Sequence, residues 1–504
     1  MKILLVNPTR SGKDSYITPP LHLLYIANAI EDKGHHAELL DVHYNFIKEN
    51  HENIPKDLYE ERCIQEIVEK DYDVLGVGSI IVSYPFTKRL CSAVKQKRPN
   101  TPIIIGGGMS MALKQLWEER TDVDYLVESD GELVIQSFLE AFPDRQALAN
   151  IPGLHYRGEN GKFVRNPPKL PKVLDYISMP RWYELKNLES YQEIMKYWIN
   201  LTLPPDLALT PKDKVLSIVM TRGCPYKCTF CYHVNHLHRR HSPEYIVNMM
   251  RESIEKYGIT VFMTLDDLIM ANVKWLSALC DALIEADLGV RIFTSGGKAN
   301  LISREVVKKM KQANFFRVSL GVESGSQTIL DKMHKQHSVE ENGNAVKVIT
   351  SEGLFTHLNM IIGFPGETFT TLKETRKFLS ELASLGLITR ENVSFSYATA
   401  FPGTDLYQQA MEMGKVPTDI EQYLSEQAGL GEYRYNLCGI SAKRLAIWRE
   451  LTLFRVKYLS DRYFNRAWQG YPRNFYLTSR AVSISLIPKP VIRLLKRILG
   501  KSTS

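Results

Sequence analysis

The chain has 504 residues, of which 44% are hydrophobic and 24% are charged, and this excludes a disordered or collagen-like protein. Its seven cysteines are too few for a disulfide-stapled secreted scaffold. The net charge of +7 is concentrated at one end: residues 441–504 contain 14 Lys and Arg against 2 Asp and Glu, whereas the rest of the chain has a net charge of −5. A weakly acidic body therefore ends in a basic tail.

The N-terminal apolar run in MKILLVNP is too short for a secretory signal, and no stretch is long and apolar enough to span a bilayer. The sequence therefore predicts a cytoplasmic protein. Thiols stay reduced in that compartment, so clustered cysteines are expected to serve as metal or redox sites.

Residues 1–145 alternate short β-branched runs with helical periodicity, which predicts a doubly wound, Rossmann- or flavodoxin-like parallel sheet. Ligands of such sheets bind beyond the carboxyl ends of the strands. The residues expected at those ends are Asn7, Ser79, Gly106 and Gly107. The glycine run could equally form a tight turn that allows close packing.

Residues 146–212 are rich in proline and predict a linker without long periodic elements. Strand and helix patterns then alternate over residues 213–410 in six units, which predicts a partial (β/α)6 barrel of the TIM type. Residues 411–504 are expected to form a mostly helical C-terminal extension.

Three cysteines lie within eight residues, as Cys224, Cys228 and Cys231 in a C-x3-C-x2-C pattern. Three thiolates on one loop suit a [4Fe–4S] cluster whose fourth iron stays open for another ligand. The alternative is a structural zinc site completed by a distant His233 or His236. The other four cysteines stand singly in apolar stretches and are expected to be buried.

This cysteine loop follows the first strand of the barrel series and has Phe230 before its third cysteine, a pattern that resembles the radical SAM superfamily. Further stretches that resemble the family follow later strands in the same order. They are Leu265-Asp266-Asp267, Gly321 to Ser326, Ile361 to Thr368, and Ala400 to Thr404.

The resemblance implies that Cys224, Cys228 and Cys231 hold the cluster and that the open iron binds S-adenosylmethionine (SAM). The implied SAM contacts are Phe230, Asp266, Asp267, Glu323, Ser324 and Gly363. Three alternatives stay open: Phe230 as a core aromatic, the two aspartates as caps of the next helix, and Glu323 as a surface turn residue. Many relatives have an arginine where this chain has Lys298.

Residues 1–145 resemble the cobalamin-binding domain of one branch of that superfamily, through the opening ILLVNP, the stretch GHHAELLD and the run IIIGGG. The resemblance implies cobalamin contacts at Asn7, Ser79, Gly106 and Gly107. The D-x-H-x-x-G motif, which supplies histidine to cobalt, is absent, and His43 is expected to be a surface residue. A domain that has lost the cofactor is the alternative.

Together these features predict a cobalamin-dependent radical SAM enzyme that methylates an unactivated carbon, with a low-potential electron donor of the flavodoxin or ferredoxin type. The alternative is a cyclase or C–C coupling enzyme that acts on a membrane lipid or tetrapyrrole. A tRNA methylthiotransferase would need more cysteines in the N-terminal domain. A hypothesis of a different functional class is a non-catalytic protein that senses cobalamin or redox state.

The tail has two amphipathic basic segments, Lys443 to Leu459 and Ile484 to Leu499. They favour peripheral contact with the inner face of a membrane and a small-molecule or lipid-like substrate. The alternatives are a structural cap on the barrel and single-stranded nucleic acid, of which the last is the weakest.

Overall fold

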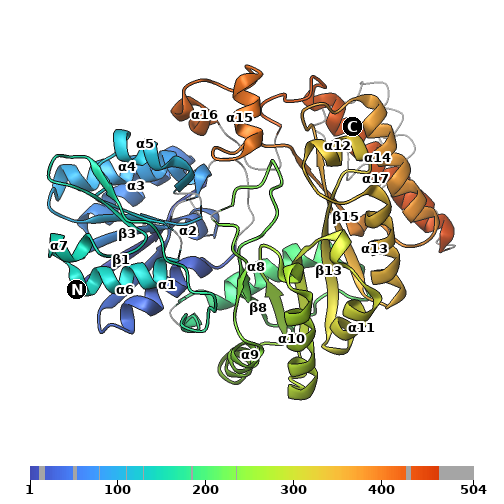
Figure 1. Cartoon of the computed structure of the whole chain (residues 1–504), viewed down its shortest axis with the longest axis horizontal. Coiled ribbons are helices and arrows are strands. Elements are labelled where there is room, and N and C mark those ends of the chain that lie inside the picture. Colours follow the sequence, from blue (N-terminus) through green and yellow to red (C-terminus); the bar gives the residue numbers. More distant parts are fainter. Residues whose placement is uncertain are drawn as a thin grey trace, which may run out of the picture.

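The computed structural model describes most of the chain as an N-terminal α/β domain beside a parallel barrel, with C-terminal helices that contact both (Figure 1). The described residues are 1–10, 18–48, 54–78, 80–108, 111–128, 130–182, 185–233, 235–426 and 433–464. The predicted fold class is confirmed.

The N-terminal domain is built on a seven-stranded sheet with the order β2-β1-β3-β4-β5-β6-β7. The strands are β1 (Lys2–Asn7), β2 (His36–Asp41), β3 (Val74–Gly78), β4 (Ile103–Gly106), β5 (Tyr125–Val127), β6 (Leu154–Arg157) and β7 (Phe163–Arg165). The first five strands are parallel, whereas β6 and β7 add on antiparallel. The strand order reverses between β1 and β3, so a ligand is expected at the carboxyl ends of these two strands.

Helices cover both faces of this sheet because successive side chains of β1 point in opposite directions. Ile3 and Leu5 pack with α1 and α6, and Leu4 and Val6 pack in the core of the other face, with α3, α4 and α5. The helices are α1 (Leu21–Glu31), α2 (Val42–Lys48), α3 (Lys56–Glu69), α4 (Tyr84–Lys97), α5 (Lys114–Arg120), α6 (Gly131–Ala141) and α7 (Arg145–Leu148).

The second domain is a six-stranded, all-parallel sheet with the order β15-β14-β13-β12-β11-β8. Its strands are β8 (Val215–Ile218), β11 (Val261–Thr264), β12 (Arg291–Gly297), β13 (Phe315–Glu323), β14 (Phe355–Ile362) and β15 (Val393–Tyr397). Its helices are α9 (Pro243–Tyr257), α10 (Val273–Ala286), α11 (Arg304–Gln312), α12 (Gln327–Lys332), α13 (Val339–Ser351) and α14 (Phe369–Ser384). Because β8 and β15 are the two edges of the sheet, the barrel is partial.

The expectation that residues 146–212 lack a long periodic element is wrong. The segment contributes β6 and β7 to the N-terminal sheet, and it also contains the thirteen-residue helix α8 (Leu188–Asn200). Met195, Ile199 and Leu203 pack against Val215, Val261 and Phe293 of the barrel strands. This apolar contact fills one end of the barrel. The prolines of the segment lie around α8 and do not prevent the helix from forming.

The C-terminal helices are α15 (Asp405–Glu412), α16 (Ile420–Glu426) and α17 (Ala442–Tyr463). Glu421 of α16 accepts hydrogen bonds from the hydroxyl of Tyr84 at 2.5 Å and from Nζ of Lys88 at 2.7 Å, both on α4. Helix α17 packs on α14, where Arg376 donates to Thr452.

The second basic segment, Ile484 to Leu499, lies outside the described residues. Among those that are described, no helix is long and apolar enough to cross a membrane.

The contact between α8 and the barrel gives a matched test in two leucines. Leu203 is 4% exposed in the apolar cluster at the end of the barrel, whereas Leu201 is 52% exposed. We expect Leu203→Ala to lower the free energy of unfolding by about 2–5 kcal/mol, because it leaves a cavity, and Leu201→Ala to lower it by less than about 0.5 kcal/mol. Chemical denaturation measures both. Equal effects of the two substitutions would contradict a packed barrel end.

Candidate functional site

The three clustered cysteines lie on one loop, residues 223–238, which is closed by a short antiparallel hairpin. Its strands are β9 (Thr221–Arg222) and β10 (Arg239–Arg240). Gly223 starts the loop with a φ of +87°, and a Cβ atom there would lie 2.3 Å from the carbonyl oxygen of Leu237. Only glycine fits where the two sides of the loop approach so closely.

Two aspartates at the end of β11 fix this loop to the barrel. Asp266 is buried and accepts hydrogen bonds from the backbone N–H groups of Met220, at 2.9 Å, and Thr221. Asp267 accepts one from the N–H of Gly223 at 2.7 Å. The helix-cap alternative is wrong, because Asn272 caps α10. Burial raises the pKa of Asp266 to about 6.

The thiols differ in their surroundings. Cys228 is buried, and Cys224 and Cys231 are half-buried. A hydrogen bond from Cys231, together with the charges of Lys335 and Lys298, outweighs burial and lowers the pKa of Cys228. Burial raises the pKa of Cys224.

Lys335 brings a buried positive charge to the cysteine loop, and no local sequence pattern predicted this role. Its Nζ lies 3.0 Å from Oε1 of Glu323, the two side chains are about one-tenth exposed, and its ammonium faces the ring of Phe230 at 5.8 Å. Burial alone would lower the pKa of Lys335, but the charges of Glu323 and Cys228 outweigh it and raise the pKa. The surface-turn alternative for Glu323 is therefore wrong.

The backbone around this ion pair is strained. Glu323, His334 and Gln336 have φ angles of +61°, +51° and +54°, which residues other than glycine seldom adopt. Each such residue costs of the order of 1–3 kcal/mol and persists only where its surroundings hold it. The carbonyl of Met333 accepts from the N–H of Thr229 at 3.1 Å, so this strained turn is attached to the cysteine loop.

Lys298 lies on the other side of the same turn. Its Nζ donates to the carbonyl oxygen of Lys335, lies 3.4 Å from Nδ1 of His337 and sits 4.3 Å from the centre of the Tyr226 ring. Burial, reinforced by the charge of Lys335, lowers the pKa of Lys298 to about 8. Two lysines therefore flank the cysteine loop.

The remaining residues expected to contact SAM are engaged with the protein itself. Phe230 is half-buried against a core cluster. Ser324 is buried with its Oγ 3.1 Å from Oγ1 of Thr375. Gly363 has a φ of +84°, and its carbonyl accepts from the hydroxyl of Tyr433 at 2.9 Å. A Cβ atom at Gly363 would lie 2.7 Å from the Tyr433 ring, so glycine is required at this position.

A cavity of about 490 Å³ separates the cysteine loop from the N-terminal domain. Gly106, Gly107 and Gly108 line it at the end of β4, and Gly76 and Gly78 line it on β3. From the barrel side it is lined by Thr221, Arg222, Gly223, Tyr232, His233, Asn235, Arg239, Leu265 and Asp267. The cavity therefore lies where the reversal in strand order predicts a ligand.

The predicted cobalamin contacts do not all reach this cavity. Asn7 instead donates to Oδ1 of Asp41 at 2.8 Å, and Asp41 also accepts from the hydroxyl of Tyr191 on α8 at 2.6 Å. Ser79 lies outside the described residues. The expectation for His43 is wrong, because it is buried at 4% exposure.

The residues present fit the predicted cofactors. Three cysteine thiols beside two lysines are a donor set suited to a cluster of negatively charged sulfurs. The cavity has the size of a small-molecule site and is walled by glycines on β3 and β4. A Cβ atom at Gly78 would lie 2.5 Å from Nε2 of His22, so a larger residue there would displace His22 and narrow the space.

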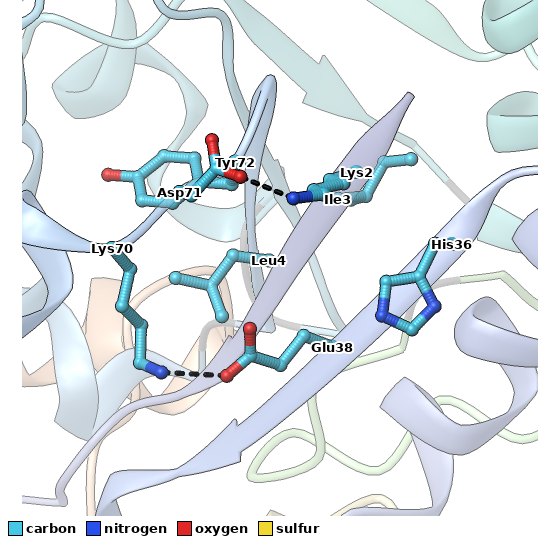
Figure 2. Close-up of a pocket in the computed structure, with 8 residues that line it drawn as sticks. All are labelled: Lys2, Ile3, Leu4, His36, Glu38, Lys70, Asp71 and Tyr72. Carbon is cyan, nitrogen blue, oxygen red and sulfur yellow. Dashed lines mark hydrogen bonds and ion pairs between the residues drawn. The ribbon is translucent and has the colours of Figure 1, made fainter.

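A smaller hollow of about 240 Å³ lies at the opposite, amino-terminal end of β1 and β2 (Figure 2). It is lined by exposed ion pairs, Lys70 with Glu38 at 2.7 Å and Lys2 with Asp71. Exposed pairs of this kind contribute little to stability, and the hollow lies away from the carboxyl ends of the strands, where ligands of such sheets bind. We therefore place the candidate site in the larger cavity.

Comparison with known proteins gives two matching families: the radical SAM superfamily over residues 218–379 and the B12-binding domain over residues 11–139. An uncharacterized methyltransferase of Pyrococcus horikoshii is 27% identical over 82% of this chain and 83% of its own length. The anaerobic magnesium-protoporphyrin IX monomethyl ester cyclase of Rubrivivax gelatinosus is 24% identical, over 84% of this chain and 72% of its own. The fold is also similar to that of the cobalamin-dependent SAM radical enzyme OxsB with aqua-cobalamin and SAM bound, at a TM-score of 0.65 and 15% identity, over 89% of this chain and 65% of that one.

The turn after β14 gives a pH-dependent prediction. Glu367 is 2% exposed and accepts from the N–H of Gly363. Its carboxyl has its ordinary pKa of 4.5 in the unfolded chain, and burial raises this to about 7 in the folded protein. Between these pH values the folded protein keeps a proton that the unfolded chain releases, so the free energy of unfolding falls as the pH rises, by up to about 3 kcal/mol.

In Glu367→Gln this titration is absent. The free energy of unfolding of the variant minus that of the parent should therefore increase from about pH 4.5 to about pH 7 and stay constant above. Urea denaturation over this range measures the difference, with the substitution Glu381→Gln, at an exposed position of helix α14, as control. A difference that does not change with pH would contradict a buried Glu367 whose pKa is raised.

Proposed function

Since the chain belongs to the radical SAM superfamily and carries a B12-binding domain, we propose that it is a cobalamin-dependent radical SAM methyltransferase that acts on an unactivated carbon. The observation that carries the proposal is the cavity. Its lining comes on one side from the carboxyl ends of β3 and β4 and on the other from the loop of Cys224, Cys228 and Cys231. One space therefore faces both cofactor sites.

In this proposal the cluster and SAM supply a 5′-deoxyadenosyl radical when bound, and cobalamin carries the methyl group. The chain's own part is to hold the cofactors and to exclude water from the cavity. Cys224, Cys228 and Cys231 ligate three irons, and the ammonium groups of Lys298 and Lys335 offset the negative charge of their thiolates. The glycines of β3 and β4 let a large ring approach the backbone.

Among the residues proposed to contact SAM, Asp267 and Phe230 keep that role, whereas the backbone N–H and carbonyl of Gly363 are bonded to Glu367 and Tyr433. Asp266 and Ser324 have a different part, because their hydrogen bonds to Thr221 and Thr375 hold the loops that carry those contacts. Glu323 acts by keeping the Lys335 ammonium beside the cysteine loop.

The second candidate function is ring formation or C–C coupling without methyl transfer, as the name of the Rubrivivax relative suggests. The fold does not separate the two reactions, because both would use the same cavity. The products do: methylation converts part of the SAM to S-adenosylhomocysteine, whereas coupling yields only 5′-deoxyadenosine and methionine.

A reaction with candidate substrates therefore tests the proposal. Protein reconstituted anaerobically with iron, sulfide and cobalamin, and reduced by a flavodoxin or ferredoxin, is expected to form S-adenosylhomocysteine and 5′-deoxyadenosine together with a methylated product. Chromatography with mass detection measures all three. Formation of 5′-deoxyadenosine alone with every substrate tried would refute methyl transfer and favour the second candidate.

Replacement of the three loop cysteines separates the two cofactor sites. We expect Cys224→Ala, Cys228→Ala and Cys231→Ala, combined, to remove the iron and SAM cleavage but to leave corrinoid binding at the parent level. Metal analysis and the corrinoid absorption band measure this. The control is Cys280→Ala on α10, a buried cysteine outside the loop. A triple variant that loses SAM cleavage but keeps the protein's function in the cell would point to the non-catalytic sensor.

We also propose peripheral membrane contact through α17 and the basic tail. Ile447 and Leu451 are exposed one turn apart on α17, and Lys443, Arg444 and Arg455 are exposed on the same helix. An exposed apolar pair flanked by cations suits the surface of an anionic bilayer. Such contact would bring the enzyme to a lipid-like substrate.

Sedimentation with vesicles tests this contact. We expect binding to phosphatidylglycerol vesicles that weakens with salt and is absent for phosphatidylcholine. The double variant Ile447→Gln with Leu451→Gln should bind more weakly, whereas Leu58→Gln, an exposed leucine on α3, should bind as the parent does. Equal sedimentation of all three proteins with both lipids would refute a membrane role for α17.

A further inference from the structure

The wall of the cavity contains buried charges that the proposed chemistry does not use. Arg222 directly precedes Gly223 and Cys224. Its Nη1 lies 3.0 Å from Oδ1 of Asp130 and 3.1 Å from Oε2 of Glu132, and its Nη2 lies 2.6 Å from Oε1 of Glu132. One guanidinium therefore holds two carboxylates with both of its terminal nitrogens.

A second arginine completes the group. Arg239 lies directly opposite Arg222 in the hairpin, is 1% exposed, and has its Nη2 3.0 Å from Oδ1 of Asp130. The hydroxyl of Tyr176 donates to the same carboxylate at 2.6 Å. Burial alone would raise the pKa of Asp130, but the hydrogen bond from Arg239 and the charge of Arg222 outweigh it and lower the pKa to about 2.

The carboxylates and the arginines belong to different domains. Asp130 and Glu132 stand at the start of α6, next to the glycine-lined end of the N-terminal sheet, whereas both arginines belong to the hairpin that closes the cysteine loop. Two like charges face to face across a hairpin repel each other. Among the described residues, the carboxylates that pair with both arginines, Asp130 and Glu132, come from the N-terminal domain, and the hairpin depends on them.

We infer that Arg222 is a positioning residue whose paired contacts with Asp130 and Glu132 set the distance and orientation of the cluster loop relative to the cobalamin site. A planar guanidinium that holds a carboxylate through two nitrogens fixes direction as well as distance, which a lysine ammonium does not. Asp266 and Asp267 fix the same hairpin to the barrel, so the loop is attached on both sides. The inference rests on the proposed function.

The test compares Arg222→Lys, which keeps the charge, and Glu132→Gln, which keeps the shape, with Glu140→Gln as matched control. Glu140 is at the far end of α6 and pairs with Lys33 at the surface. The readout is electron paramagnetic resonance of protein that holds both the reduced cluster and cob(II)alamin. The magnetic coupling of the two spins falls steeply with their distance.

We expect Arg222→Lys and Glu132→Gln to keep parent levels of iron and corrinoid but to show a weaker and more broadly distributed coupling. Glu140→Gln should match the parent. Parent-like coupling in both cavity variants would overturn the inference.

The second readout is hydrogen–deuterium exchange of the same proteins without cofactors. This measurement still tests the inference for a variant that has lost a cofactor. Residues 221–240 and the first turn of α6 should exchange several-fold faster in both variants, and β8 and β11 should not change. Unchanged exchange at the hairpin would overturn the inference. A parent protein that binds no corrinoid would refute the proposed function instead, and exchange alone would then decide the role of Arg222.

Discussion

The hairpin that closes the cysteine loop is held by charged side chains on two sides, and the placement of the cavity depends on these contacts. Asp266 and Asp267 accept its backbone N–H groups from the barrel, and Asp130 and Glu132 pair with its arginines from the N-terminal domain. Removal of one partner from a buried pair costs about 3–5 kcal/mol, since the other charge is left in the protein interior. These contacts therefore hold the two walls of the cavity together.

A similar balance operates deeper in the barrel. Lys335 reaches the cysteine loop from a turn in which its two neighbours, His334 and Gln336, adopt positive φ angles. Glu323 also adopts a positive φ and supplies the counter-charge. Strain of this kind concentrates at functional sites, where the surrounding packing can hold it. Tyr433, from beyond the barrel, in turn covers Gly363 at the end of β14. The C-terminal extension therefore packs against a residue that the family resemblance places near SAM.

Much of this could be predicted from the sequence, because the alternation of strands and helices and the cysteine spacing are local patterns. The parallel sheet, the partial barrel and the loop that joins Cys224, Cys228 and Cys231 follow from them. Helix α8 was missed because prolines around it suggested a linker, although its apolar face packs on the barrel. Lys335 and the partners of Arg222 were missed since a contact between Arg222 and Glu132 depends on the docking of two domains, which no short pattern encodes.

The central claim is that one cavity serves a cluster and a corrinoid in the same chain. The most direct measurement is the content of iron, sulfide and corrinoid in protein purified anaerobically from cells supplied with cobalamin. We expect about four irons per chain with an equimolar corrinoid. Protein with a full complement of iron that neither retains nor takes up the corrinoid would contradict it.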